Sequence, residues 1–472
     1  MFRKLPGDET RNLVSTTPET AVVFRPAIIR TPAAVTLVIW AWRTLIALIR
    51  TLYRHPIACL LPLALGFLCV QYGWRTTLLL TAPALTGLTA WAILDPAGFN
   101  RLLGRRLLAW WRLMANYRRH WNAVMDVSGL ARRIHGRDYQ PRLLRVRCDD
   151  WADLVTVRML KGQTARDWSD RADNLAQGFG APTCRITHQR GDRLLLTFSR
   201  TDPLATPIPA RALPPIPTVG PIDIGIREDG HPWTLDLHGT HVLIAGATGA
   251  GKGSVLWSAI RGLLPAVHAG LAEIWALDPK LMELSYGRPL FGPRYAADPA
   301  DCADLLDDAV KVMQARAARF AGHSRTHIAT VDDPFVLVVV DEIAFLTAYQ
   351  ADRDLKRRIS AALATLTTQG RAVGVGVMAA LQDPRKEVMN IRNLFPDKIA
   401  LRLDESEQVD MVLGDGARDR GALADHISPV PYVGAGVGYV RLEASPDPIR
   451  VRAAYVSDAD IHAMVAELRQ AA

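Results

Sequence analysis

Cysteine is scarce and follows no metal-binding or disulfide pattern. The chain has five cysteines, Cys59, Cys69, Cys148, Cys184 and Cys302. None of them forms a C-x-x-C pair, and the sequence has no zinc-finger pattern of paired cysteines and paired histidines. We therefore expect neither a zinc site nor a disulfide framework, and a reducing cytoplasm fits this usage.

A signal peptide is missing from the first 30 residues. This segment is polar, carries charges of both signs and lacks a short apolar core followed by a small-residue cleavage site. We expect residues 1–33 to form a polar N-terminal tail.

Length and charge set only broad limits. At 472 residues the chain is long enough for two or three domains, which makes a single compact fold a poor expectation. The formal charge of +9 favours an acidic partner such as nucleic acid or anionic lipid.

Acidic residues are absent from two long apolar stretches, residues 57–73 and 76–94. As helices rising about 1.5 Å per residue, each is just long enough to span a bilayer. Only Trp74 and Arg75 separate the stretches, so we expect two transmembrane helices in a tight hairpin. Arginines flank its outer ends, which predicts a cell-membrane protein with both termini in the cytoplasm. A buried helical hairpin of a soluble core is the alternative, because each stretch contains a proline.

Two segments flank this hairpin. Residues 34–49 are apolar but carry Arg43 in the middle, and because a charge at the bilayer centre is costly, we expect an interfacial amphipathic helix. Residues 101–120 interleave arginines with aromatics, a pattern that also occurs in nucleic-acid sites. Their position directly after a membrane stretch favours a basic juxtamembrane helix. The predicted membrane region spans residues 34–122.

No catalytic constellation occurs between the membrane region and the proline-rich segment that follows. Residues 143–199 show the patterns of two strands, a helix and two further strands, which predicts a small α/β domain over residues 140–202. Residues 203–222 are too rich in proline for a helix or a central strand, and we interpret them as a linker, either a semi-rigid spacer or a covering segment.

A glycine-rich turn follows the apolar run HVLIA, which begins at His241. A strand, the loop GATGAGK and a helical pattern that we expect to end before Pro265 form the context that a phosphate-binding P-loop requires. Backbone N–H groups of such a loop surround the phosphate oxygens, and its lysine reaches the outer phosphates. The predicted nucleotide contacts are Gly246, Ala247, Thr248, Gly249, Ala250, Gly251, Lys252, Gly253 and Ser254.

The P-loop lacks its usual magnesium ligand, because Gly253 stands where such loops carry a serine or threonine. Magnesium retains several waters, so the loss is survivable, and Asp341 remains as a ligand. Ser254 or Thr248 can supply the missing oxygen. We therefore expect the site to hydrolyse the bound nucleotide despite Gly253.

Four more apolar segments complete the expected nucleotide-binding domain. Residues 273–280 end in Asp-Pro-Lys, residues 334–346 contain Asp341 and Glu342 after a strand, residues 373–382 end in Gln382, and residues 397–403 form another strand. Asp341 is expected to hold magnesium through water, Glu342 to activate the attacking water, and Gln382 to sense the γ-phosphate. Alternation with helical patterns, such as residues 301–320, predicts a parallel sheet covered by helices on both faces, with the ligand at the carboxyl ends of its strands.

These segments resemble the FtsK/SpoIIIE family of ring-forming DNA pumps, which includes FtsK-like plasmid transfer proteins. The resemblance covers GATGAGKG, LDPKLMELS, VVVDEIAFL, GRAVGVGVMAALQDP and VSDADIHAMV. The Asp-Pro-Lys segment discriminates, since generic P-loop proteins do not carry it.

The resemblance implies an α/β P-loop NTPase motor with a RecA-like sheet over residues 223–472, preceded by the small α/β domain and the transmembrane hairpin. It implies an ATP- and Mg²⁺-dependent homo-hexamer that threads double-stranded DNA through its channel, with Lys252, Asp341, Glu342 and Gln382 in the catalytic site. Arg371 and Arg402 are the candidates for an arginine finger that reaches a neighbouring subunit's ATP, and either is equally a structural ion-pair residue. The basic residues after the third strand are candidate phosphate contacts or parts of a solvated loop; they are Arg385, Lys386 and Arg392.

Some family members that select a DNA sequence continue into a winged-helix module, and no such module follows the motor segment here. We therefore expect a separate partner to recognise DNA sequence, and conjugative plasmid transfer to be the occasion rather than chromosome segregation. Two alternatives remain. One is a secretion-type ATPase that moves protein substrates, and the other is a nucleotide-binding membrane scaffold that does not hydrolyse ATP.

Overall fold

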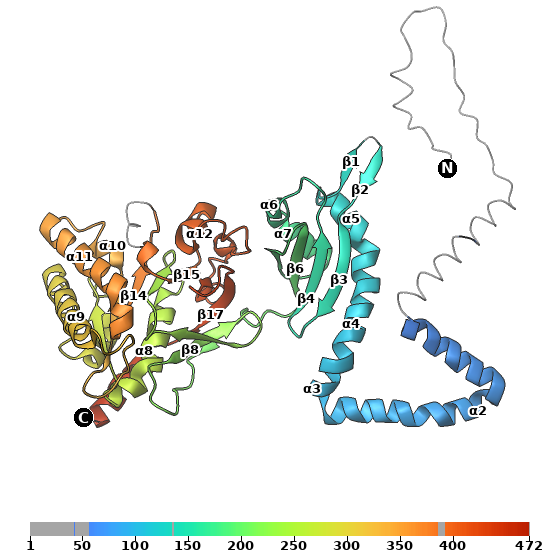
Figure 1. Cartoon of the computed structure of the whole chain (residues 1–472), viewed down its shortest axis with the longest axis horizontal. Coiled ribbons are helices and arrows are strands. Elements are labelled where there is room, and N and C mark those ends of the chain that lie inside the picture. Colours follow the sequence, from blue (N-terminus) through green and yellow to red (C-terminus); the bar gives the residue numbers. More distant parts are fainter. Residues whose placement is uncertain (1–41, 43–55, 135, 386–391, 472) are drawn as a thin grey trace, which may run out of the picture. The chain divides into compact units, whose positions relative to one another are not determined.

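The computed structural model describes residue 42 and residues 56–134, 136–385 and 392–471 (Figure 1). The predicted polar tail, residues 1–33, lies outside the described residues, as does the predicted interfacial helix, residues 34–49, apart from residue 42. The contacts divide the chain into two units, Met1–Phe99 and Asn100–Ala472.

The first unit contains the long apolar helix α2 (Pro56–Leu94) and the short helix α3 (Pro96–Phe99). Gly73, with φ 81° and ψ 158°, interrupts α2, which bends sharply (Figure 1). The expected turn at Trp74 and Arg75 therefore occurs one residue earlier, because this backbone conformation is open almost only to glycine. Within the described residues, one segment, Gly66–Leu94, is long and apolar enough to cross a membrane.

The second unit begins with a basic helical run that packs on a small sheet. The run consists of η2 (Asn100–Gly104), α4 (Arg105–Arg112), η3 (Leu113–Arg118) and α5 (Arg119–Val127). Tyr117, Trp121 and Met125 of this run are buried in one core with Phe179 and Phe198. The basic segment therefore belongs to the fold of the domain that follows it.

The sheet of this middle domain is antiparallel, in the order β3-β4-β6-β5. The single helix expected in this domain is present as two short helices, with Asp170 and Arg171 between them. Thr164 begins the first helix with a capping box. A two-stranded hairpin precedes the sheet. The elements are β1 (Arg132–Ile134), β2 (Arg137–Tyr139), β3 (Arg142–Cys148), β4 (Ala152–Arg158), α6 (Ala165–Ser169), α7 (Ala172–Gly178), β5 (Cys184–His188) and β6 (Arg193–Ser199).

A buried carboxylate ties the basic helical run to this sheet. Asp153 of β4 is fully buried, and Tyr117 donates its hydroxyl to Asp153 Oδ2 over 2.8 Å. Arg200 Nε lies 2.8 Å from the same oxygen, and Arg112 pairs with Oδ1. One charge thus satisfies two arginines and a tyrosine from three segments.

The nucleotide-binding domain is built on one large sheet in the order β12-β11-β13-β14-β10-β15-β16-β17-β8-β9, with β7 beside β17. The strands from β12 to β15 pair in parallel, whereas β15, β16, β17, β8 and β9 pair antiparallel. The strands are β7 (Ile208–Pro209), β8 (Pro221–Arg227), β9 (Pro232–Asp236), β10 (Val242–Ala245), β11 (Ala272–Leu277), β12 (Tyr295–Ala296), β13 (Phe335–Val340), β14 (Val375–Leu381), β15 (Asp397–Leu401), β16 (Val437–Arg441) and β17 (Ile449–Tyr455). The five strands that the sequence patterns predicted, β10, β11, β13, β14 and β15, pair in parallel as expected. The antiparallel strands beyond β15 were not predicted, and they make the sheet mixed.

Helices cover both faces of this sheet. On β10, Leu243 and Ala245 pack into one apolar cluster, and Val242 and Ile244 pack into the other. A strand that is apolar at every position is thus explained by burial on both sides. The helical elements are α8 (Lys252–His268), η4 (Leu284–Phe291), α9 (Pro299–Phe320), α10 (Ile343–Leu346), α11 (Arg353–Gln369), η5 (Gly370–Val373), α12 (Ser406–Leu413), η7 (Ala424–His426) and α13 (Asp458–Ala471).

Helix α8 continues past Pro265 to His268, so the expected end before Pro265 was wrong. Pro265 lies in the last turn, where only one intrahelical hydrogen bond is lost to it.

The proline-rich segment contributes to the fold of the large-sheet domain. Ile208 and Pro209 pair in parallel with Ala454 and Tyr455 of β17. Just before this strand, Asp202 forms an ion pair with Arg450 of β17, at 3.0 Å. The segment therefore covers one edge of the domain.

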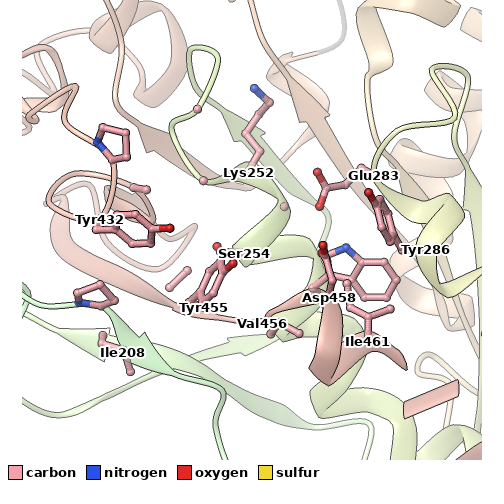
Figure 2. A pocket seen from close by; sticks show the side chains of 18 of the residues that line it. Ile208, Lys252, Ser254, Glu283, Tyr286, Tyr432, Tyr455, Val456, Asp458 and Ile461 are labelled. Atoms are coloured by element: carbon pink, nitrogen blue, oxygen red, sulfur yellow. The ribbon is translucent and has the colours of Figure 1, made fainter. Parts of the chain in front are cut away.

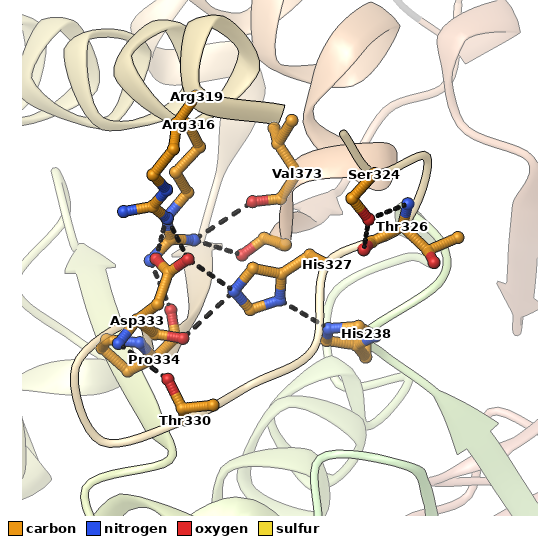
Figure 3. A network of polar contacts seen from close by, with 11 residues as sticks. His238, Arg316, Arg319, Ser324, Thr326, His327, Thr330, Asp333, Pro334 and Val373 are labelled. Atoms are coloured by element: carbon orange, nitrogen blue, oxygen red, sulfur yellow. Dashed lines mark hydrogen bonds and ion pairs between the residues drawn. The ribbon is translucent and has the colours of Figure 1, made fainter. Parts of the chain in front are cut away.

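At the amino-terminal ends of β13 and β14, a polar network ties α9 to the sheet (Figure 3). Arg316, which is 5% exposed, donates to the carbonyl oxygens of Val373 and Gly374 and pairs with Asp333 at 2.7 Å. His327 lies between Asp333 and His238, with 2.9 Å between the two imidazole nitrogens. This network fixes the strand starts at the edge opposite the P-loop.

Candidate functional site

The P-loop joins the end of β10 to the start of α8, at the carboxyl edge of the sheet. Gly249 and Gly251 have φ values of 72° and 94°, which disfavour other residues. A Cβ on Gly251 would also lie 2.3 Å from the backbone nitrogen of Gly436. The loop therefore needs glycine here for both conformation and close packing.

Lys252 is the first residue of α8, and its ammonium folds back over the loop. Nζ donates to the carbonyl oxygens of Gly246, at 2.8 Å, and Ala247, at 3.4 Å. Burial lowers the pKa of Lys252 below its ordinary value, against the charges of Glu342 and Asp341. The ammonium and the N-terminus of a 17-residue helix together provide a binding position for phosphate.

The structure brings Asp341, Glu342 and Gln382 to the same edge as the P-loop. Parallel pairing aligns the end of β13 with β14, and the end of β14 with β10. Glu342 Oε1 accepts the backbone N–H of Gln382 at 3.2 Å, and the Gln382 side-chain amide donates to the Thr248 hydroxyl. Strand, P-loop and acidic residues thus form one connected site.

The site carries a concentration of negative charge. Burial, together with the carboxylates of Asp278, Glu283 and Glu342, raises the pKa of Asp341 to about 7. A divalent cation relieves such repulsion, and carboxylate oxygens are the ligands that magnesium prefers. The residues present therefore fit the Mg²⁺ that accompanies ATP, with Asp341 as one holder.

The Asp-Pro-Lys segment after β11 contributes structure and charge that the sequence patterns did not reveal. Asp278 is fully buried, and its Oδ2 accepts the backbone N–H of Ser285 at 2.9 Å and the Tyr295 hydroxyl at 3.3 Å. Lys280 Nζ lies 3.2 Å from Glu342 Oε2. The aspartate thus builds the loop, and the lysine contacts the expected general base.

A cavity of about 460 Å³ opens from the P-loop (Figure 2). Tyr432, Tyr455 and Ile208 line its far side, and the backbone of Tyr432 has a φ of 65°, unusual for a residue other than glycine. Ser254 lies on the Tyr455 side of this space, away from Glu283 (Figure 2). The sequence patterns around these residues carry no signal for a ligand, since Ile208 lies in the proline-rich segment, Tyr432 in a loop and Tyr455 at the end of β17.

The arginine-finger candidates lie at opposite edges of the sheet. Arg402 donates to the carbonyl oxygen of Thr248 at 2.9 Å, so it contacts this chain's own P-loop. Arg371 forms a two-pronged ion pair with Glu443 and donates to Gly239, before β10. Only Arg402 is therefore close to the nucleotide site of its own chain.

The basic residues after β14 have local partners. Arg385 lies 3.5 Å from Asp383, and Arg392 donates to the carbonyl oxygen of Met411. Lys386 lies outside the described residues.

The ion pair of Lys280 and Glu342 predicts an effect on turnover. We expect Lys280→Met to lower the ATP turnover rate about 10- to 100-fold, because the carboxylate loses the contact that orients it. Binding of a fluorescent ATP analogue should change little. Lys311→Met, at an exposed lysine paired with Asp308 on α9, is the matched control. Turnover that rises in Lys280→Met would contradict an orienting role.

Comparisons with known proteins agree with the motifs. Residues 217–424 match the model of the FtsK/SpoIIIE family, which confirms the resemblance. The chain is 26% identical over 284 residues to DNA translocase FtsK of Mycobacterium tuberculosis (strain CDC 1551 / Oshkosh), covering 52% of this chain and 32% of the relative. It is 24% identical over 272 residues to DNA translocase FtsK of Staphylococcus aureus (strain Mu50 / ATCC 700699), covering 53% and 32%. The chain thus spans about a third of the length of these curated relatives.

Two solved structures are also similar. One is the pCW3 conjugation coupling protein TcpA in a monomer form with ATPγS, with a TM-score of 0.48 and 20% identity, covering 74% of this chain and 99% of that one. The other is the cytoplasmic domain of the type VII secretion ATPase EccC of Thermomonospora curvata, with a TM-score of 0.40 and 20% identity, covering 55% and 29%.

Proposed function

We propose, because residues 217–424 match the model of the FtsK/SpoIIIE family, that this chain is a membrane-anchored ATPase that uses ATP hydrolysis to move double-stranded DNA. The observation that carries the proposal is the convergence of Lys252, Glu342 and Gln382 on the P-loop. This is the set of groups that ATP hydrolysis needs: a cation for the phosphates, a base for water and an amide near the γ-phosphate.

Each residue has a proposed role. Lys252 leaves the loop carbonyls and binds the outer phosphates. Glu342 accepts a proton from the attacking water, and Gln382 links the γ-phosphate to strand β14. Magnesium, held at Asp341, neutralises phosphate charge when bound. The apolar end of the cavity, at Ile208 and Tyr455, receives the adenine ring of ATP.

We propose a ring, with a hexamer as the expected assembly, in which a neighbouring subunit completes the site. Arg371, at the edge opposite the P-loop, can act only on a neighbour's nucleotide, whereas Arg402 acts on its own. This difference makes Arg371 our first candidate for the arginine finger.

The membrane anchor is the bent helix α2. Its apolar side chains are exposed, among them Leu79 at 73% and Ile93 at 77%, which favours lipid rather than a protein core as their environment. We propose that both arms cross the cell membrane, with both ends in the cytoplasm, where Arg101 and Arg106 follow the second arm.

As the biological occasion we propose conjugative plasmid transfer rather than chromosome segregation, with a separate partner to recognise DNA sequence. The support is the short connection between anchor and motor, which consists of the basic helical run, the middle domain and the proline-rich segment.

The proposal predicts DNA-stimulated ATP hydrolysis. We expect the steady-state ATPase rate of the purified protein to rise severalfold with linear double-stranded DNA and to lose this stimulation as salt increases, because phosphate contacts release counterions. Lys252→Ala should abolish both rates. ATPase activity indifferent to DNA would favour a secretion ATPase that moves protein, and ATP binding without turnover would favour a membrane scaffold.

A further inference from the structure

The space beside Gly253 is filled by a carboxylate from another loop. A Cβ on Gly253 would lie 2.0 Å from Oε1 of Glu283 and 2.6 Å from its Cδ. The first separation is little more than a carbon–carbon bond of about 1.5 Å. The Glu283 oxygen therefore lies where the side chain of a serine or threonine would begin, and glycine at this position makes room for it.

Glu283 is held there by the loop that Asp278 builds. The buried Asp278 carboxylate accepts the backbone N–H groups of Ser285, at 2.9 Å, and Met282, at 3.4 Å, on either side of Glu283. Leu281 has a φ of 56°, so the backbone turns sharply just before Glu283. The carboxylate thus projects from a fixed loop toward the start of α8 (Figure 2).

The surroundings of Glu283 are prepared for a further partner. The Trp257 side chain is 2% exposed, and its indole N–H faces the Glu283 carboxylate. Trp257, Glu283 and Asp341 line the same cavity as the P-loop. Two carboxylates that face one cavity repel each other until a cation binds between them.

The other oxygens near the loop are less suited to replace the missing hydroxyl. The Thr248 hydroxyl accepts from the Gln382 amide. Ser254 lies toward Tyr455, on the other side of the helix start (Figure 2).

We propose that the Glu283 carboxylate replaces the P-loop hydroxyl as the second protein ligand, beside Asp341, for the magnesium ion of bound ATP. Magnesium is a hard cation that selects oxygen ligands, and a carboxylate binds it more strongly than the neutral hydroxyl. The proposal rests on the ATP site of the proposed function and is independent of DNA.

The test exchanges the two possible ligands and measures how strongly Mg²⁺ supports nucleotide binding. The affinity for a fluorescent ATP analogue is measured across a Mg²⁺ titration, and without Mg²⁺ in EDTA, for four proteins: wild type, Glu283→Ala, Gly253→Ser and the double variant. Glu467→Ala is the matched control, because it removes an exposed carboxylate on α13 that does not line the cavity.

We expect Glu283→Ala to need at least about 10-fold more Mg²⁺, with its Mg²⁺-free affinity unchanged. The double variant should regain most of the Mg²⁺ dependence, because the serine hydroxyl enters the space that Glu283 has left. Glu467→Ala should behave as wild type. The proposal is overturned if Glu283→Ala retains the wild-type Mg²⁺ dependence, if the wild type shows none, or if the added serine rescues nothing. None of these readouts uses DNA, so a failure here is distinct from a lack of DNA stimulation.

Discussion

Glu342→Gln is expected to reduce ATP turnover about 10²- to 10⁴-fold, the range in which a general base contributes. The amide keeps the size of the side chain and can still accept the backbone N–H of Gln382. It cannot take a proton from water. Binding of ATP should therefore stay within a few-fold of wild type, since Lys252 and the P-loop backbone are untouched.

The measurement is a single-turnover hydrolysis assay beside equilibrium binding of the same nucleotide. Glu467→Gln is the matched control, because Glu467 is an exposed carboxylate on α13 that does not line the nucleotide cavity. A Glu342→Gln protein that hydrolyses ATP at the wild-type rate would assign the base to another residue, and one that no longer binds ATP would make Glu342 a binding residue.

Asp153→Asn is expected to destabilise the middle domain by about 3 to 5 kcal/mol, the cost of removing one partner from a buried ion pair. Asp153 is fully buried, and its loss leaves Arg112 and Arg200 without their shared counter-charge. The loss of stability should be confined to the middle domain, since the P-loop lies in a domain with a separate apolar core. Hydrogen exchange of the β4 and β6 amides, read by mass spectrometry, measures the free energy of opening.

Asp150→Asn provides the control, because Asp150 lies two residues before β4 and its side chain is 75% exposed. Its ion pair with Arg105 should contribute less than about 1 kcal/mol. If the β4 and β6 amides of Asp153→Asn were as well protected from hydrogen exchange as those of Asp150→Asn, a structural role for the buried charge would be contradicted.

The effect of Asp153 should also depend on pH. Burial alone would raise the pKa of Asp153, but the hydrogen bond from Cys148 and the charge of Arg200 lower it below the ordinary value. A carboxylate with a depressed folded pKa contributes stability above its unfolded pKa, about 3.9, and the contribution is lost as the pH falls through the folded pKa. The difference between wild type and Asp153→Asn should narrow at acid pH.

Local patterns predicted the parts of the site that lie within single segments. The P-loop glycines, Asp341, Glu342 and Gln382 follow apolar strands, so periodicity and turn residues were enough to expect them at one edge. The direction of β16 and β17 could not be predicted in this way. Their antiparallel pairing depends on how the chain returns to the sheet, and the periodicity of a strand carries no information on that.

Contacts between different loops could not be predicted from these sequence patterns. Lys280 and Glu342 are 62 residues apart along the chain, and Glu283 reaches Gly253 from a different loop. Their meeting depends on how β11, β13 and α8 pack. Gly253 itself looked like a missing ligand, because a sequence shows which side chain is absent but not what fills its place.

Strand β7 has a mechanical consequence. The peptide that enters the motor domain from the middle domain passes Asp202, held by Arg450, then pairs with β17 at Ile208, and only afterwards reaches β8. Ile208 also forms a wall of the nucleotide cavity. In the proposed membrane-anchored motor, tension along this peptide would act on the Asp202–Arg450 ion pair and on β7, at the rim of the cavity, before it reached β8. Because the same peptide links the middle domain to the large sheet and lines the cavity, a load on the proposed anchor would act at the nucleotide site.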